Sequence, residues 1–154
     1  MPQMERGGKY VFGWSQVSQG GVVVIPGEAI QEYGLNPGTE VTLISGSNSS
    51  GGFVVAIKSL LKQSKMGSIL TDLPDLDNEQ TEEGRIFVLR DRKYCRSRVG
   101  NNNTLELKPQ VLEAFNITPG DRLLSVRGSY IGLSMISKGL IVKCAKRHSE
   151  LECY

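Results

Sequence analysis

The stretch IQEYGLNPGTEVTLISGS, from Ile30 to Ser47, is matched by LEAFNITPGDRLLSVRGS, from Leu112 to Ser129. Sliding the chain over itself by 82 residues aligns the two stretches without a gap. In this register Pro37-Gly38 falls on Pro119-Gly120, and apolar positions fall on apolar positions. A register that preserves residue class, turn residues and their order predicts an internal duplication.

Each copy predicts the same order of elements: a short strand, a helix of about two turns, a tight turn and a β-hairpin. Pro26 and, one position later in the second copy, Pro109 suit the first turn of the helix. Gly34 and Asn116 follow the helix, where a left-handed cap needs a residue that tolerates positive φ. We expect strands at 22–25, 39–44 and 53–57 in the first copy, and at 104–107, 121–126 and 131–136 in the second.

The chain has 154 residues, which suits one domain or two small lobes that share a core. Its 18 glycines and low aromatic content favour turns and strands over long helices. A unit of four short strands and one helix is too small to exclude water from its own core, and it leaves strand edges open. We therefore expect a mainly-β fold with short helices, in which the second copy closes the first.

Two segments carry a family resemblance: VVIPGEAIQEYGLNPGTEV, from Val23 to Val41, and LELKPQVLEAFNITPGDRL, from Leu105 to Leu123. They resemble the AbrB, SpoVT and MazE-antitoxin superfamily, in a tandem form with two copies in one chain. The resemblance covers roughly residues 10–57 and 92–137, although Lys108 stands where the family has a proline. It implies a swapped-hairpin (AbrB-like) β-barrel, formed by two internal repeats that interleave their hairpins, and a C-terminal helical extension.

Resemblance and composition together divide the chain into four parts. These are AbrB-like repeat 1 (8–58), an acidic linker (59–84), AbrB-like repeat 2 (85–138) and a C-terminal extension (139–154). Residues 71–84 of the linker hold six acids and no base, which is typical of an exposed or partly disordered connector. A flexible linker of this length lets the repeats pair within one chain. We expect a pseudo-dimeric monomer, with a homodimer as the alternative.

The sequence RDRKYCRSRV, from Arg90 to Val99, is the strongest candidate for a binding surface. As one strand, its period of two places one set of residues on a single face: Arg90, Arg92, Tyr94, Arg96 and Arg98. Four guanidiniums in a row suit contact with phosphates, and the resembled family contacts DNA around the first hairpin of each copy. The alternatives are a solvated, protective face, or a turn at Asp91-Arg92 that divides the row.

Repeat 1 lacks this row of cations. The positions that match Arg90, Arg92, Lys93, Arg96 and Arg98 hold Gly8, Tyr10, Val11, Trp14 and Gln16. Residues 85–154 have a net charge of +7, whereas residues 1–57 have −2 and residues 58–84 have −3. Any nucleic-acid contact should therefore be one-sided. We expect Trp14 to fill the core, with an exposed anchor for a partner as the alternative.

Our first functional hypothesis is a DNA-binding transcriptional regulator of the AbrB/SpoVT type, with double-stranded DNA as its partner. The predicted phosphate contacts are Arg90, Arg92, Arg96 and Arg98, with Lys108 and Arg127 as weaker candidates. The second hypothesis is a protein-interaction module, antitoxin-like or an assembly adaptor, that has lost DNA binding. A third is that the acidic connector folds over the arginine row and masks it.

No residue pattern predicts catalysis, a cofactor or a metal. The single histidine, His148, lies in a basic tail, and carboxylates are sparse in both repeats. SGSNSSGG, from Ser45 to Gly52, lacks the lysine of a phosphate loop and is expected to be an enlarged hairpin turn. Cys95, Cys144 and Cys153 match no standard zinc spacing with His148.

Two features suggest where the protein resides. The longest apolar runs, VVVI from Val22 and FVVAI from Phe53, are too short to span a bilayer, and the N-terminus does not resemble a signal peptide. The three cysteines form no CxxC pair, which suits a reducing compartment. We therefore expect a cytoplasmic protein without membrane contact.

Overall fold

The computed structural model describes residues 10–128, 131–148, 150–151 and 153–154. Gly8 and Ser129, which the repeat alignment uses, lie outside these residues. The strands are β1 (Val11–Gln16), β2 (Val22–Val24), β3 (Glu40–Ser45), β4 (Phe53–Ile57), β5 (Phe87–Leu89), β6 (Arg92–Arg98), β7 (Thr104–Glu106), β8 (Arg122–Arg127) and β9 (Gly132–Ile136). The helices are α1 (Gly27–Tyr33), α2 (Lys58–Gln63), α3 (Ser68–Asp72), α4 (Pro109–Ala114) and α5 (Leu140–Ala145), with 3-10 turns η1 (Lys65–Gly67), η2 (Pro74–Asp77) and η3 (Asn101–Asn103).

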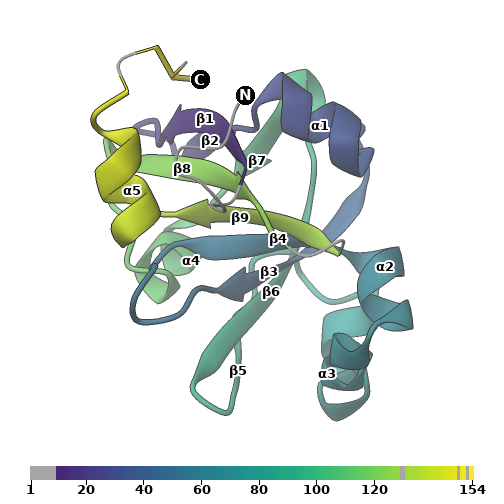
Figure 1. Ribbon diagram of the computed structural model, residues 1–154. Helices are drawn as coiled ribbons and strands as arrows, with labels where there is room; N and C mark the ends of the chain where they lie inside the picture. The colour runs from purple at the N-terminus through teal and green to yellow at the C-terminus, as the bar shows by residue number, and fades with distance from the viewer. Residues whose placement is uncertain (1–9, 129–130, 149, 152) are drawn as a thin grey trace.

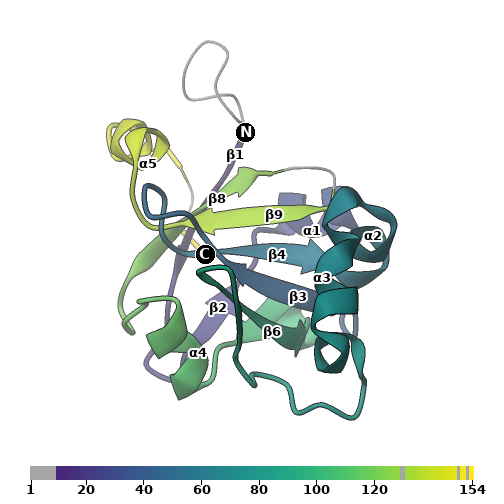
Figure 2. The ribbon, with the colours of Figure 1, turned by 90° about the horizontal axis from the view of Figure 1, so that it is seen from below.

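Antiparallel strands make up most of the fold. Seven strands form one sheet in the order β1-β8-β9-β4-β3-β6-β5, and β2 pairs with β7 in a separate ribbon (Figures 1 and 2). The predicted mainly-β fold with short helices is confirmed. Among the described residues, no helix combines the length and apolar character that crossing a membrane requires.

Two equivalent strands, β1 of repeat 1 and β6 of repeat 2, each pair with a strand of the other repeat. β1 lies beside β8, where Gln16 pairs with Arg122, and β6 lies beside β3, where Arg98 pairs with Glu40. Adding 82 to Gln16 gives Arg98, and subtracting 82 from Arg122 gives Glu40, so the two pairings are equivalent. The repeats are therefore intertwined, and their pairing obeys the register found in the sequence.

Two further pairings lie on the pseudo-twofold axis. In the β2–β7 ribbon Val23 pairs with Leu105, its own repeat equivalent. In the sheet, β4 pairs with β9, the equivalent strand of repeat 2. Hydrogen bonds outside the strands follow the same rule, because Gly38 N donates to Val99 O and Gly120 N donates to Val17 O, both at 2.7 Å. The symmetry thus extends through the whole interface between the repeats.

The helix ends confirm the predicted caps. Gly34 follows α1 with φ of 64°, and Asn116 follows α4 with φ of 55°. This left-handed conformation is the one that glycine and asparagine tolerate best. Pro109 occupies the first turn of α4, as predicted, whereas Pro26 is the N-cap of α1. The caps turn the chain sharply into β3 and β8.

One apolar core is shared by both repeats. Its members come from β1, β2, β3, β4 and α1 in repeat 1 and from β6, β7, β8, β9 and α4 in repeat 2. Phe53 of the first repeat stacks on Phe115 of the second, with ring centroids 5.4 Å apart. Neither repeat could bury this surface alone, which agrees with the argument from size.

The predicted closed barrel differs from the observed sheet, which is open. Among the described strands, β1 and β5 form its two edges and do not pair with each other. Other segments occupy the positions where closure would occur. The outer edge of β1 binds the C-terminal tail, since Tyr154 N donates to Trp14 O at 2.7 Å. The outer edge of β6 pairs with β5 and then binds Gly84, whose N donates to Arg96 O at 3.0 Å.

The acidic connector, residues 71–84, is mostly exposed, as predicted, but its first half forms η2 and buries Leu76. Residues 58–77 fold into α2, η1, α3 and η2, and the linker buries Leu61, Ile69, Leu70 and Leu76 against Ile44 and Tyr94 of the sheet. The apolar residues at 60, 61, 69, 70, 73 and 76 supply this packing, although the acids between them suggest solvent exposure. The linker is therefore a covering layer.

The C-terminal extension covers the opposite end of the sheet, on the same face as the linker. α5 and the α2–α3 segment lie at opposite ends of the molecule in both views (Figures 1 and 2). Val142, Ala145 and Leu151 pack against Trp14 and Leu124. Trp14 is 4% exposed, so its predicted core position is confirmed. Each repeat is thus followed by a segment that starts with a helix. The linker after repeat 1 ends with a hydrogen bond to the carbonyl of Arg96, and the extension after repeat 2 ends with one to the carbonyl of the equivalent residue, Trp14.

Candidate nucleic-acid interface

The β5–β6 hairpin carries the most exposed cations among the predicted contacts. It projects from the body of the molecule (Figure 1). Its turn is Arg90-Asp91, and the exposed side chains of Arg90, Arg92 and Lys93 surround it. Within the part of the chain that the structure describes, none of these three cations has an ion pair. They are available to an external anion.

The turn has an unusual composition. Arg90 and Asp91 have φ of 50° and 67°, whereas two-residue hairpin turns with positive φ at both positions favour Asn-Gly. A side chain in the left-handed region costs about 1 kcal/mol per residue. This turn also corrects the sequence prediction, because Arg90 leaves the strand and the row of arginines is divided between Arg90 and Arg92.

From Arg92 onward the predicted face exists, but it points toward the linker. Tyr94 is 5% exposed and packs against the linker's apolar side chains. Arg96, two residues further on, is 4% exposed. Cys95, between them, belongs to the shared core on the other face. Alternation along β6 was therefore predictable, whereas the identity of the covered face was not.

Arg96 is bound on all sides by the protein itself. Its guanidinium donates to Glu40 Oε1 at 2.9 Å, to the carbonyl oxygen of Thr81, and to that of Glu79 at 3.4 Å. Burial raises the pKa of Glu40, but Lys58 and Arg96 outweigh burial and hold that pKa below its usual value. In this conformation Arg96 has a structural role and cannot reach a phosphate.

The three remaining predicted cations are partly exposed, and each is paired with a carboxylate. Arg98 lies 3.1 Å from Glu40 and 3.6 Å from Glu83. Lys108 lies 3.6 Å from Glu82. Arg127 forms a two-point contact with Glu32, starting with a 2.7 Å bond from its Nε, and also lies over the Tyr10 ring at 4.6 Å. These charges are locally neutralised.

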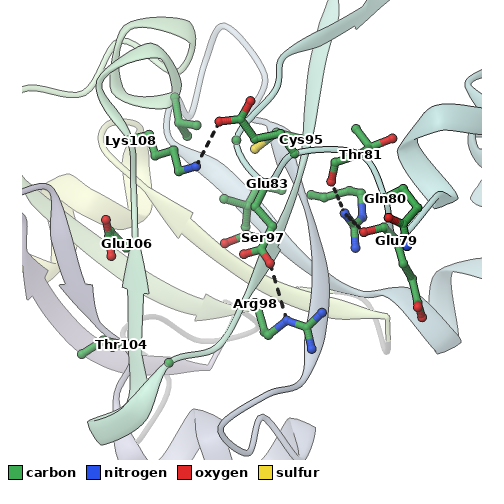
Figure 3. Close-up of a pocket in the computed structure, with 16 residues that line it drawn as sticks. Glu79, Gln80, Thr81, Glu83, Cys95, Ser97, Arg98, Thr104, Glu106 and Lys108 are labelled. Carbon is green, nitrogen blue, oxygen red and sulfur yellow. Dashed lines mark hydrogen bonds and ion pairs between the residues drawn. The ribbon is translucent and has the colours of Figure 1, made fainter.

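A polar cavity of about 540 Å³ separates the outer edge of β6 from β7. Figure 3 shows Arg98 and Lys108 directed into it, each joined to a carboxylate of the segment that precedes β5. Cys95 also lines the cavity, and burial raises its pKa to about 12. The thiol is therefore protonated and unreactive at neutral pH.

A second cavity, of about 410 Å³, lies on the other side of the hairpin. It is bordered by the Gly46–Gly52 loop, by Asp91 and Lys93, and by Lys138. The loop joins β3 to β4, so the predicted enlarged hairpin turn is confirmed. A period of two puts Lys93 on the face opposite the arginine row, so it is not among the predicted contacts. Its exposure follows from its pairing with Val88 at the edge of the sheet.

The cysteines and the histidine lie apart in the residues described. Cys95 and Cys144 are buried, and Cys153 is exposed. His148 pairs with Glu150 at 2.9 Å. No group of three or more potential ligand side chains comes together within the described ranges.

Comparison with known proteins adds little to this description. No protein-family model matches the sequence, and no curated protein matches it. The solution structure of PHS018 from Pyrococcus horikoshii is similar with a TM-score of 0.37 and 14% identity, over 84% of this chain and 97% of that one. At this TM-score the likeness carries no argument about fold or function.

Proposed function

We propose that the protein is a non-enzymatic DNA-binding regulator of the AbrB/SpoVT type that contacts phosphates through the β5–β6 hairpin. The observation that carries the proposal is the projecting turn with Arg90, Arg92 and Lys93 exposed and without ion pairs among the described residues. Such a group provides the sequence-independent part of DNA affinity, because each phosphate contact releases a counterion.

The exchange of strands between the repeats supports the family assignment. In the resembled superfamily two copies interleave their hairpins, and here β1 and β6 each pair with the opposite repeat. We infer a tandem member in which both copies reside in one chain, as a pseudo-dimeric monomer. The sheet is then open because covering segments bind the outer edges of β1 and β6, at Trp14 O and Arg96 O.

The proposed contact is one-sided. Tyr10 and Val11 of repeat 1 are equivalent to Arg92 and Lys93, and Val11 is fully buried. The Tyr10 hydroxyl donates a hydrogen bond to Glu28. This bond raises the pKa of Tyr10 to about 12, so the phenol is neutral. A duplex gripped through one hairpin does not require a palindromic site, because palindromes mirror a twofold arrangement of contacts.

A salt titration of binding to random-sequence duplex DNA tests this proposal. We expect affinity to fall steeply with salt, with a log–log slope of about −2 to −3 for three contacts. The variant Arg90→Glu/Arg92→Glu should lose most of the affinity. Its matched control, Lys143→Glu/Lys146→Glu on and beside α5, makes the same charge change and should retain it. Equal losses in both variants, or no binding at low salt, would contradict the proposal.

The alternative is a protein-interaction module, and one observation favours it. Val88 is 63% exposed on β5, and among the described strands β5 is an edge strand, with no strand on its outer side. An extended segment of a protein partner could add a strand there. A stoichiometric partner that is lost in Val88→Lys, together with no retardation of DNA at low salt, would favour this function over DNA binding.

A further inference from the structure

Three of the predicted phosphate contacts lie under one short acidic segment. We define the acidic strap as residues 78–84, NEQTEEG, which hold three carboxylates and no apolar side chain. Glu82 pairs with Lys108, and Glu83 pairs with Arg98. The carbonyl of Thr81 accepts from Arg96. The strap therefore supplies oxygen atoms to a row of cations, as a phosphate backbone would.

The strap follows one buried anchor, Leu76, and from there on its contacts with the sheet are polar. Leu76, just before it, is fully buried. Gly84, at its other end, has φ of 88° and donates its N–H to Arg96 O. Between these points the side chains of Glu79, Gln80 and Glu82 are exposed. The exposed pairs of Glu82 and Glu83 contribute about 0–1 kcal/mol each and weaken with salt. The bonds from the buried Arg96 to the Glu79 and Thr81 carbonyls must be replaced by bonds to an anion when the strap detaches.

The cavity beneath the strap is large enough for an anion. Its volume is about 540 Å³, and its lining includes Arg96, Arg98 and Lys108. With the strap lifted, Arg98 and Lys108 lose the carboxylates of Glu83 and Glu82. Glu40 remains paired with Arg98, and Glu106 lines the same cavity. A polyanion with several closely spaced phosphates could then replace the carboxylates as the partner of these cations.

We propose that the acidic strap is a releasable cover over a second phosphate-binding groove formed by Arg96, Arg98 and Lys108. The inference rests on the proposed function, because the same duplex would first engage the β5–β6 hairpin. Arg96 and Arg98 lie on the same strand as Arg92 of the hairpin and are separated from it by the buried Tyr94. The strap competes with phosphates for the groove, so the closed protein has only the hairpin contacts and the open protein has both.

The first test neutralises the strap. In Glu82→Gln/Glu83→Gln, duplex affinity should rise and the log–log salt slope should steepen by about 2, one unit for each freed cation. The control Asp72→Asn/Glu113→Gln makes the same charge change at exposed sites outside the strap and should leave the slope unchanged. Adding Arg98→Gln/Lys108→Gln to the strap variant should restore the wild-type slope. An unchanged slope in the strap variant would overturn the inference, even if the hairpin variant shows that DNA binding is real.

The second test does not depend on DNA. Inorganic tripolyphosphate should speed amide hydrogen exchange at Gly84 more than sodium chloride does at equal ionic strength. The amide of Tyr154, which binds the equivalent carbonyl of Trp14, is the internal control and should not change. If Gly84 keeps its protection in tripolyphosphate, the strap is a fixed part of the fold and the inference fails.

Discussion

The two ends of the sheet are covered by segments that bind through different contacts, apolar at Trp14 and polar at Arg96. Trp14 and Arg96 are equivalent residues, and both are 4% exposed. Trp14 lies opposite Leu124 and is sealed by α5 and Leu151, with Arg122 over its ring at 4.6 Å. Arg96 lies opposite Thr42 and is sealed by Glu40 and the strap. Apolar burial does not weaken with salt, whereas the exposed pairs that the strap makes, Glu82–Lys108 and Glu83–Arg98, do. The comparison therefore predicts one permanent cover and one reversible cover.

The largest expected effect breaks the apolar end. Trp14→Ala should lower the free energy of unfolding by about 3–5 kcal/mol, because it removes a buried aromatic group and leaves a cavity. Denaturant melts measured at low and high salt should show the same loss, since no ion pair of Trp14 is involved. A loss below about 1 kcal/mol would mean that α5 does not seal this end.

The next effect breaks the ionic end. Glu40→Gln should cost about 2–3 kcal/mol, because it leaves the buried guanidinium of Arg96 without its carboxylate. Combining it with Arg96→Met should recover at least half of that loss, as both charges are then absent. Denaturant melts of the two single variants and the double variant measure the coupling. Strictly additive losses would contradict the assigned pair.

The ionic end should also make stability depend on pH. The pKa of Glu40 and that of Asp77 are lowered, since nearby lysines, with Arg96 beside Glu40, outweigh burial. A carboxylate with a lowered folded-state pKa stabilises the fold above its unfolded pKa, and this stabilisation disappears as the pH falls through the folded value. We expect stability to decline as the pH falls below about 5, and to decline less in Glu40→Gln. Identical pH profiles would exclude Glu40 as a source.

The smallest effect concerns the turn of the proposed interface. Asp91→Gly relieves one of the two positive-φ side chains and should stabilise the protein by about 0.5–1 kcal/mol. It also removes the acid beside Arg90 and Arg92, so duplex affinity should rise slightly. Thermal melts and the salt titration give both values. If Asp91→Gly lowers the melting temperature instead, Asp91 makes a stabilising contact in spite of its exposure.

Much of the fold was predictable because the repeat carries its own turn chemistry. Gly34, Asn116, Gly38 and Gly120 all adopt positive φ at the positions that the alignment indicated. The packing of the linker on the sheet was not predictable from its composition. Its acids outnumber its bases, which suggests exposure, although its apolar residues pack on the sheet. The symmetry of the two covering segments has no sequence signal, since it depends on where their ends dock.

The candidate site was only partly predictable. Period-two alternation correctly placed Arg92, Arg96 and Arg98 on one face of β6, but it cannot tell a covered face from an open one. That distinction depends on Glu40, 56 residues from Arg96 in sequence, and on the strap. Lys93 was missed for the same reason, because its exposure arises from the β5–β6 pairing.

The measurement that tests the central claim most directly is a backbone-amide NMR titration with random-sequence duplex DNA. It reports on both ends of the sheet in a single experiment. We predict that the shifts concentrate on residues 85–93, with the strap following at higher DNA concentration, while α5 and the C-terminal tail stay unchanged. Shifts of equal size around Trp14 and around Arg96 would contradict a one-sided phosphate-binding surface.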